Sequence, residues 1–179
     1  MWFGDLVTMK WWNDLWLKES FADYCAGTCL ITIAPKFKST YVNPEQTFLH
    51  FMTEAINEDI RDTTHPVQVE VRDTIDAVNV FDKICYRKGA CFLRQVAYYV
   101  GEDVLKEGMK SYFEQFALKN TELADFMGCF QQAAKSKNID IDLDSWMKSW
   151  LQTSGINTLS PEIVEKNGKF VINVKQGKA

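Results

Sequence analysis

The chain has 179 residues, a net charge of −4 and 46% hydrophobic residues, which fits one domain with a small appendage and excludes wholesale disorder. Its basic residues are scattered, so it lacks the basic patch of a nucleic-acid-binding protein. No apolar run reaches the roughly 18 residues that a membrane-spanning helix needs.

The amino-terminal segment has no basic start and therefore does not resemble a signal peptide. It is also the most aromatic part of the chain, whereas domain termini are usually polar and exposed, so we expect the chain to start inside a larger domain. The cysteines are odd in number and lie in apolar segments, which indicates reduced thiols in the core of a cytoplasmic protein. They are Cys25, Cys29, Cys85, Cys91 and Cys129.

The first predicted helix runs from Asn13, as its N-cap, to about residue 33. Glu19 and Asp23 are four residues apart and share one face of it. Glu19 lies among apolar and aromatic residues that a protein normally buries, so its carboxylate needs a cation or hydrogen bonds. The residues alone favour a lysine or arginine partner over a metal. A catalytic zinc site normally has three protein ligands, and His50 and His65 are not spaced as a helical pair.

The remaining pattern predicts a mainly α fold. We expect a loop over 34–44, a helix from 44 to about 61, and a short extended piece or edge strand over 67–73, where valines alternate with polar residues. A helical pattern over 77–100 is interrupted near Tyr86–Gly89, where the glycine should permit close packing. Further helices are predicted over 105–116, from a cap at Asn120 and Thr121 to about residue 135, and over 143–150.

The tail after Pro161 differs from the helical part. Asn167 and Gly168 separate two alternating segments, and this dipeptide is a strong signal for a β-hairpin, because both turn positions need a positive φ. Two strands are too few to be stable alone. We therefore predict two units: a mostly helical part over residues 1–158, and the start of a small β domain over 159–179.

The opening WFGDLVTMKWWNDLWLKESFADY resembles a segment of the gluzincin family of zinc aminopeptidases, of the aminopeptidase N and puromycin-sensitive aminopeptidase type. In that family a glutamate follows the zinc motif HExxH at a fixed distance and is the third zinc ligand. The 18 residues from Met1 to Lys18 equal that distance. The resemblance implies that Glu19 is a Zn²⁺ ligand and that the helical part is the carboxyl-terminal portion of a thermolysin-like catalytic domain.

A second motif, CYRKGA at residues 85–90, is similar to the Tyr-x-Lys-Gly-Ala signature of the same family. The resemblance implies that the Tyr86 hydroxyl stabilises the oxyanion that forms on the scissile carbonyl. Asp23 would accept a hydrogen bond from a histidine ligand of the zinc and so orient it, or else it would be a solvated carboxylate on the helix face. Arg87 and Lys88 either line the pocket or form a solvated turn.

The sequence departs from the family because it lacks HExxH, the general-base glutamate within it, and the segment that binds the substrate's amino group. We therefore expect a fragment of an enzyme that releases amino-terminal residues from peptides, inactive on its own. The alternative is a non-catalytic helical interaction module. In either case we expect association through an exposed apolar face, comprising Trp2, Phe3, Leu6 and Trp16.

Overall fold

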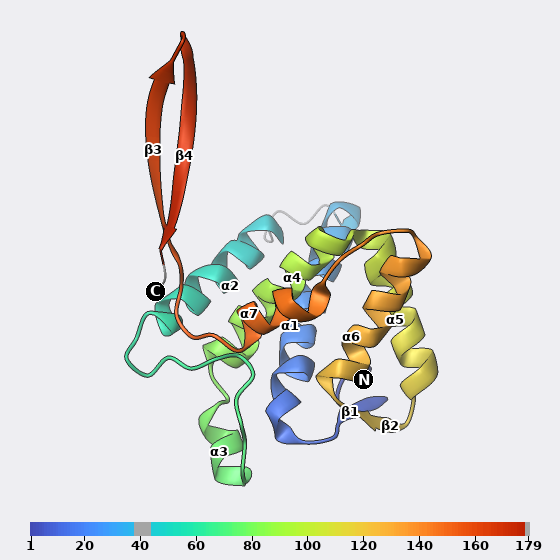
Figure 1. Cartoon of the computed structure of the whole chain (residues 1–179). Coiled ribbons are helices and arrows are strands. Elements are labelled where there is room, and N and C mark those ends of the chain that lie inside the picture. Colours follow the sequence, from blue (N-terminus) through green and yellow to red (C-terminus); the bar gives the residue numbers. More distant parts are fainter. Residues whose placement is uncertain (38–43, 178–179) are drawn as a thin grey trace.

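The structure is a computed structural model that describes residues 1–37 and 44–177; it has a helical body from which a β-hairpin projects (Figure 1). This architecture confirms the predicted mainly α fold. The helices are α1 (Leu15–Ile33), α2 (Pro44–Asp59), α3 (Thr74–Asn79), α4 (Gly89–Val100), α5 (Glu102–Phe116), α6 (Leu123–Ser136) and α7 (Leu143–Leu151). The strands are β1 (Val7–Met9), β2 (Lys119–Thr121), β3 (Thr158–Lys166) and β4 (Lys169–Gly177), and the short helical turns are η1 (Trp12–Asp14), η2 (Ala34–Phe37) and η3 (Ile84–Lys88).

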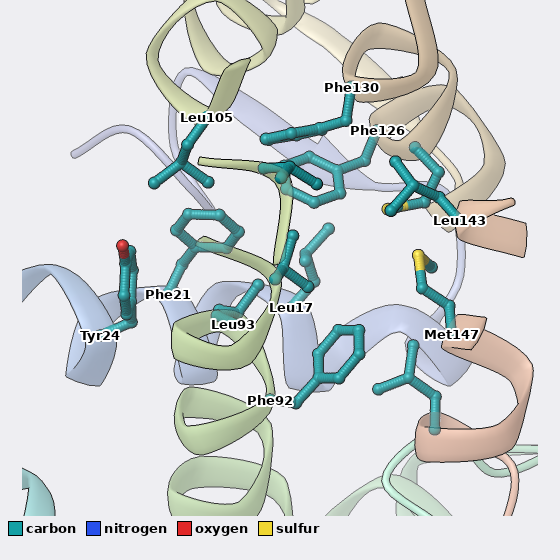
Figure 2. Close-up of a cluster of buried hydrophobic side chains, with 14 of the residues drawn as sticks. Leu17, Phe21, Tyr24, Phe92, Leu93, Leu105, Phe126, Phe130, Leu143 and Met147 are labelled. Atoms are coloured by element: carbon teal, nitrogen blue, oxygen red, sulfur yellow. The ribbon is translucent and has the colours of Figure 1, made fainter. Parts of the chain in front are cut away.

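Helix α1 lies at the centre of the body, where it contacts α2, η3 and α4. The close-up in Figure 2 shows Phe21 of α1 facing side chains from α4, α5 and α6. Phe21 packs edge-on against Phe126 with 5.2 Å between the ring centroids, a favourable geometry for aromatic pairs. Because α1 is surrounded, its apolar residues do not form one stripe, and Trp16 is only 2% exposed. The expectation that Trp16 belongs to an exposed face is therefore wrong.

A two-stranded parallel sheet joins the amino-terminal segment to the α5–α6 connection. Val7 pairs with Lys119 and Met9 with Thr121. Neither strand was predicted, because each has only three residues. The predicted helix cap at Asn120 and Thr121 is also wrong, because both residues lie in β2. The cap of α6 is Glu122, whose side chain bonds the backbone at Asp125 while the Asp125 side chain bonds back.

Residues 67–73 form no strand, so the edge strand, one of the two alternatives predicted for this segment, is wrong. Val67 and Val71 are buried, and the Gln68 amide donates to the carbonyl of Leu151 in α7. The alternation thus reflects a loop that inserts two of its three valines, Val67 and Val71, into the core.

The predicted N-cap of the first helix, Asn13, is wrong: Asn13 lies within η1, and Asp14 occupies the N-cap position of α1. The buried Asp14 carboxylate makes no capping bond and instead accepts hydrogen bonds from the Gln68 side chain and the Leu123 backbone amide.

The hairpin of β3 and β4 matches the prediction. Asn167 and Gly168 have φ values of 53° and 71°, as the tight turn requires, and Val164 pairs with Val171. Figure 1 shows the hairpin extending away from the helices. Apolar side chains on both strands are exposed. The division into units at residue 158 stays a prediction.

The cysteines are all free thiols, but they are not all in the core. Cys85 and Cys129 are buried, Cys25 and Cys91 are half-buried, and Cys29 is exposed, which corrects the expectation for Cys29. Within the described ranges, no helix is both long and apolar enough to cross a membrane. The predicted loop over 34–44 begins with η2 and otherwise lies largely outside the described residues.

Candidate active site

The two segments that carry the predicted site residues, α1 and η3, pack directly against each other. The buried Ser20 hydroxyl donates to the Cys85 carbonyl over 2.7 Å. A Cβ on Gly89 would lie 2.9 Å from the Ser20 Cβ and 3.2 Å from Trp16 Cε3, so only glycine allows this approach. The turn η3 is π-helical, a form that occurs as single turns and often at functional sites. The predicted packing role of Gly89 is confirmed.

Tyr86 and Glu19 meet across this contact. Burial raises the pKa of the Tyr86 phenol, and the neighbouring Glu19 carboxylate raises it further through hydrogen bonding and its negative charge. The phenol therefore keeps its proton at neutral pH and can donate a hydrogen bond. The structure thus brings together the two residues that the family resemblance singled out, from positions 67 residues apart in the chain. Their chemical roles are not tested by this proximity.

Glu19 also has a basic neighbour. Lys18 Nζ lies 3.1 Å from Glu19 Oε1, and the Glu19 side chain is 16% exposed. The lysine partner that the residues alone favoured is therefore present. Within the described part of the chain, no three His, Cys, Asp or Glu side chains are grouped as a metal site. A partly accessible carboxylate on a well-packed helix fits one ligand of a zinc site, but it needs further ligands.

Asp23 lies one helical turn after Glu19 and pairs with the residue after Tyr86. Its Oδ2 is 2.6 Å from Arg87 Nη1, and Arg87 Nε is 2.9 Å from Glu54 Oε2 of α2. Burial raises the pKa of Asp23, an effect that the Arg87 charge opposes. Asp23 is therefore not a solvated carboxylate on the helix face, whereas its predicted contact with a histidine ligand stays a prediction.

Asp82 anchors the beginning of the Tyr86 turn. Its Oδ1 accepts hydrogen bonds from the backbone amides of Ile84 and Cys85, over 2.9 and 3.1 Å, which satisfies amides that the start of a helical turn leaves free. Its Oδ2 lies 3.0 Å from His65 Nε2. Hydrogen bonding to Asp82 raises the pKa of His65, against the effect of burial.

Lys88 anchors the end of the same turn. Its Nζ lies 2.7 Å from Asp59 Oδ2 and 3.3 Å from the carbonyls of Thr153 and Gly155. Asp59 is 1% exposed and accepts further hydrogen bonds from Thr64 and from the Gly155 amide. The alternative of a solvated charged turn is therefore wrong for Lys88, which joins η3 to α2 and to the segment that leads into the hairpin.

An apolar groove lies along one side of α1. Its volume is about 750 Å³, and Phe21, Cys25 and Cys29 line it from α1. Trp2, which is 61% exposed, and Phe113 line it from other segments. Of the residues predicted for an exposed apolar face, Trp2 and Phe3 line this groove, whereas Leu6 and Trp16 do not.

Sequence reasoning missed the partners that hold the turn, namely Ser20, Glu54, Asp59, His65 and Asp82. Asp82 did carry a local signal, because an aspartate two residues before a helical turn is a typical cap. The other four partners are far from η3 in sequence. A single sequence carries no sign of such distant pairs.

Comparison with known proteins identifies the family. The family model for the Peptidase family M1 domain matches residues 1–150. The chain is 42% identical to Aminopeptidase N of Streptomyces lividans over 91% of its length, and 31% identical to Aminopeptidase M1 of Arabidopsis thaliana over 94%. It is 34% identical over 95% of its length to Tricorn protease-interacting factor F2 of Thermoplasma volcanium. The chain spans 18–20% of the length of these relatives. On this evidence, the chain belongs to peptidase family M1.

Proposed function

We propose that the chain is the carboxyl-terminal part of the catalytic domain of a zinc-dependent aminopeptidase. The observation that carries the proposal is the contact between the Tyr86 hydroxyl and the Glu19 carboxylate. These are the residues that match two separate family motifs. Two of the three named relatives are aminopeptidases, which supports peptides as substrates.

In the proposed enzyme Glu19 supplies one carboxylate ligand to zinc, and the other ligands come from a part of the protein outside this chain. When bound, zinc supplies Lewis-acid chemistry at the peptide carbonyl. With Glu19 bound to zinc, the Tyr86 phenol, whose pKa burial raises, would direct its single O–H to the carbonyl oxygen as negative charge develops there. The contacts of Ser20, Asp82 and Lys88 hold the turn, so that the phenol needs little reorganisation during the reaction.

We further propose that the 179-residue chain alone does not hydrolyse peptides. It contains two histidines and no HExxH sequence, and it covers 18% of the length of the two aminopeptidase relatives named above. A zinc titration and an aminoacyl-amide hydrolysis assay test this directly. We expect weak zinc binding and no turnover. Tight one-to-one zinc binding with turnover that Glu19→Ala abolishes would contradict the proposal.

The coding sequence upstream of Met1 separates the enzyme fragment from the non-catalytic interaction module. We expect an in-frame HExxH motif whose second histidine immediately precedes Met1, because this register gives Glu19 the spacing of the third ligand. A stop codon directly before Met1 would contradict the fragment proposal.

We propose a cytoplasmic location, which five free thiols support.

We also propose that the isolated chain self-associates through the apolar groove around Trp2. Sedimentation of the wild-type chain and of Trp2→Ser tests this association. We expect the variant to be more monomeric, and an unchanged distribution would contradict the role of the groove.

A further inference from the structure

Three consecutive residues of η3 each contact α1. Cys85 accepts a hydrogen bond from Ser20, and the Tyr86 hydroxyl reaches Glu19. The third contact is the ion pair of Arg87 with Asp23, at 2.6 Å. The Asp23–Arg87 pair therefore lies directly beside the candidate catalytic contact, one residue along η3 and one helical turn along α1.

Arg87 is fixed from more than one side. While Nη1 faces Asp23 of α1, Nε lies 2.9 Å from Glu54 Oε2 of α2, so different nitrogens bind carboxylates on different helices. The guanidinium also lies over the Phe51 ring, 4.1 Å from its centroid. A planar guanidinium bound at two edges and stacked on one face has little rotational freedom. A lysine, with a single point charge, cannot reproduce this arrangement.

The ion pairs are sheltered enough to hold their geometry. The side chains of Arg87, Asp23 and Glu54 are 22%, 19% and 22% exposed, whereas fully exposed pairs contribute little because water and salt screen them. Lys83 and His50 also approach Glu54, at 2.6 and 3.5 Å. Arg87 is thus the cation in this cluster that also reaches α1.

We propose that Arg87 is a positioning residue for Tyr86: its ion pairs with Asp23 and Glu54 hold η3 in the rotation that directs the Tyr86 hydroxyl to Glu19. Arg87 itself needs no contact with a substrate. The consequence for catalysis rests on the proposed function, but the positioning claim concerns only residues of this chain and is tested separately.

The test uses the 179-residue chain with 3-fluorotyrosine at its six tyrosines and ¹⁹F NMR. The Tyr86 resonance is identified by its loss in Tyr86→Phe. Glu19→Gln provides the chemical shift of Tyr86 without the neighbouring negative charge. We expect Arg87→Met and Asp23→Asn to move the Tyr86 resonance most of the way to the Glu19→Gln position or to broaden it, and Arg87→Lys to move it part of the way.

Arg94→Met is the matched control. Arg94 lies on α4 and stacks on Phe48 of α2, with 4.4 Å to the ring centroid, so its loss removes a similar cation–aromatic contact without touching η3. We expect no change at Tyr86. If Arg87→Met does not fold, Asp23→Asn and Arg87→Lys decide the question. A wild-type Tyr86 resonance in the folded variants would overturn the proposal, as would a Glu19→Gln spectrum in which Tyr86 does not move.

An activity measurement separates this inference from the proposed function. In the longer protein that the proposed function implies, we expect Arg87→Met to lower kcat for an aminoacyl amide by roughly a hundredfold, as for a misplaced catalytic group, at unchanged KM and zinc content. If Tyr86→Phe leaves kcat unchanged while the NMR shifts occur as expected, the proposed function fails and the positioning role stands. If Tyr86→Phe lowers kcat and Arg87→Met does not, the positioning role fails.

Discussion

Lys88 Nζ lies 2.7 Å from Oδ2 of Asp59, and the two side chains are 12% and 1% exposed. Removing one member of a buried ion pair leaves an uncompensated charge and costs roughly 3–5 kcal/mol. We expect Lys88→Met to lower the free energy of unfolding by about 3 kcal/mol, measured by urea denaturation. Lys106→Met, which breaks the exposed pair with Glu102, should have almost no effect. Equal stability of the Lys88→Met and wild-type chains would show that the pair does not hold the turn.

The close approach of α1 to Gly89, the first residue of α4, predicts a strong limit on side-chain size at this position. A Cβ there meets Ser20 and Trp16, and overpacking of this kind costs about 1–3 kcal/mol. We expect Gly89→Ala to lower the melting temperature. Gly128→Ala in α6 is the matched control, because a Cβ at that position has open space, and alanine in a helix is about 0.5–1 kcal/mol more favourable than glycine. The two glycine variants should therefore shift the melting temperature in opposite directions, and a shift in the same direction would contradict the packing account.

The His65–Asp82 pair predicts how stability depends on pH. Hydrogen bonding to Asp82 raises the pKa of His65. The contribution of protonated His65 to folding stability is therefore full below its ordinary pKa of 6.5 and is lost as the pH rises through the raised pKa. Burial acts to raise the pKa of Asp82, but hydrogen bonds from His65 and the backbone amides lower it overall. The contribution of Asp82 is therefore lost only as the pH falls through the lowered value, below the ordinary 3.8.

Stability from this pair should therefore be greatest between about pH 4 and 6.5 and should decline at higher pH. Urea unfolding of the wild-type chain from pH 4 to 9 measures the decline, which we expect His65→Gln to weaken. His50→Gln is the control, since His50 is largely exposed and should leave the decline intact. A wild-type decline that persists unchanged in His65→Gln would exclude this pair as its source.

Local patterns were sufficient to predict much of the fold. The helical periodicity gave the main helices, and the Asn167–Gly168 turn gave the hairpin, because both depend on residues that are close in the chain. The alternation at 67–73 was misleading, because Val67 and Val71 enter the core from a loop. The sheet of β1 and β2 joins segments more than 100 residues apart, and no local pattern marks such a pair.

The candidate site was predicted only in part for the same reason. Glu19 and Tyr86 carry family motifs and could be identified singly. The groups that hold them, such as Arg87 with Asp23 and Asp82 with His65, are defined by contacts between distant segments. Their side chains also occur in ordinary charged surfaces, so their types alone give no signal. The three-dimensional arrangement is needed to find them.

The most direct test of the account is the steady-state kinetics of the longer protein that the proposed function implies, compared with its Tyr86→Phe and Glu19→Gln variants. Removing one oxyanion donor costs about 10²–10³ in kcat, so Tyr86→Phe should lose this factor for an aminoacyl amide while keeping its KM and zinc content. Glu19→Gln should lose zinc as well as activity. Full activity and full zinc content in both variants would contradict the assignment of these two residues to an aminopeptidase active site.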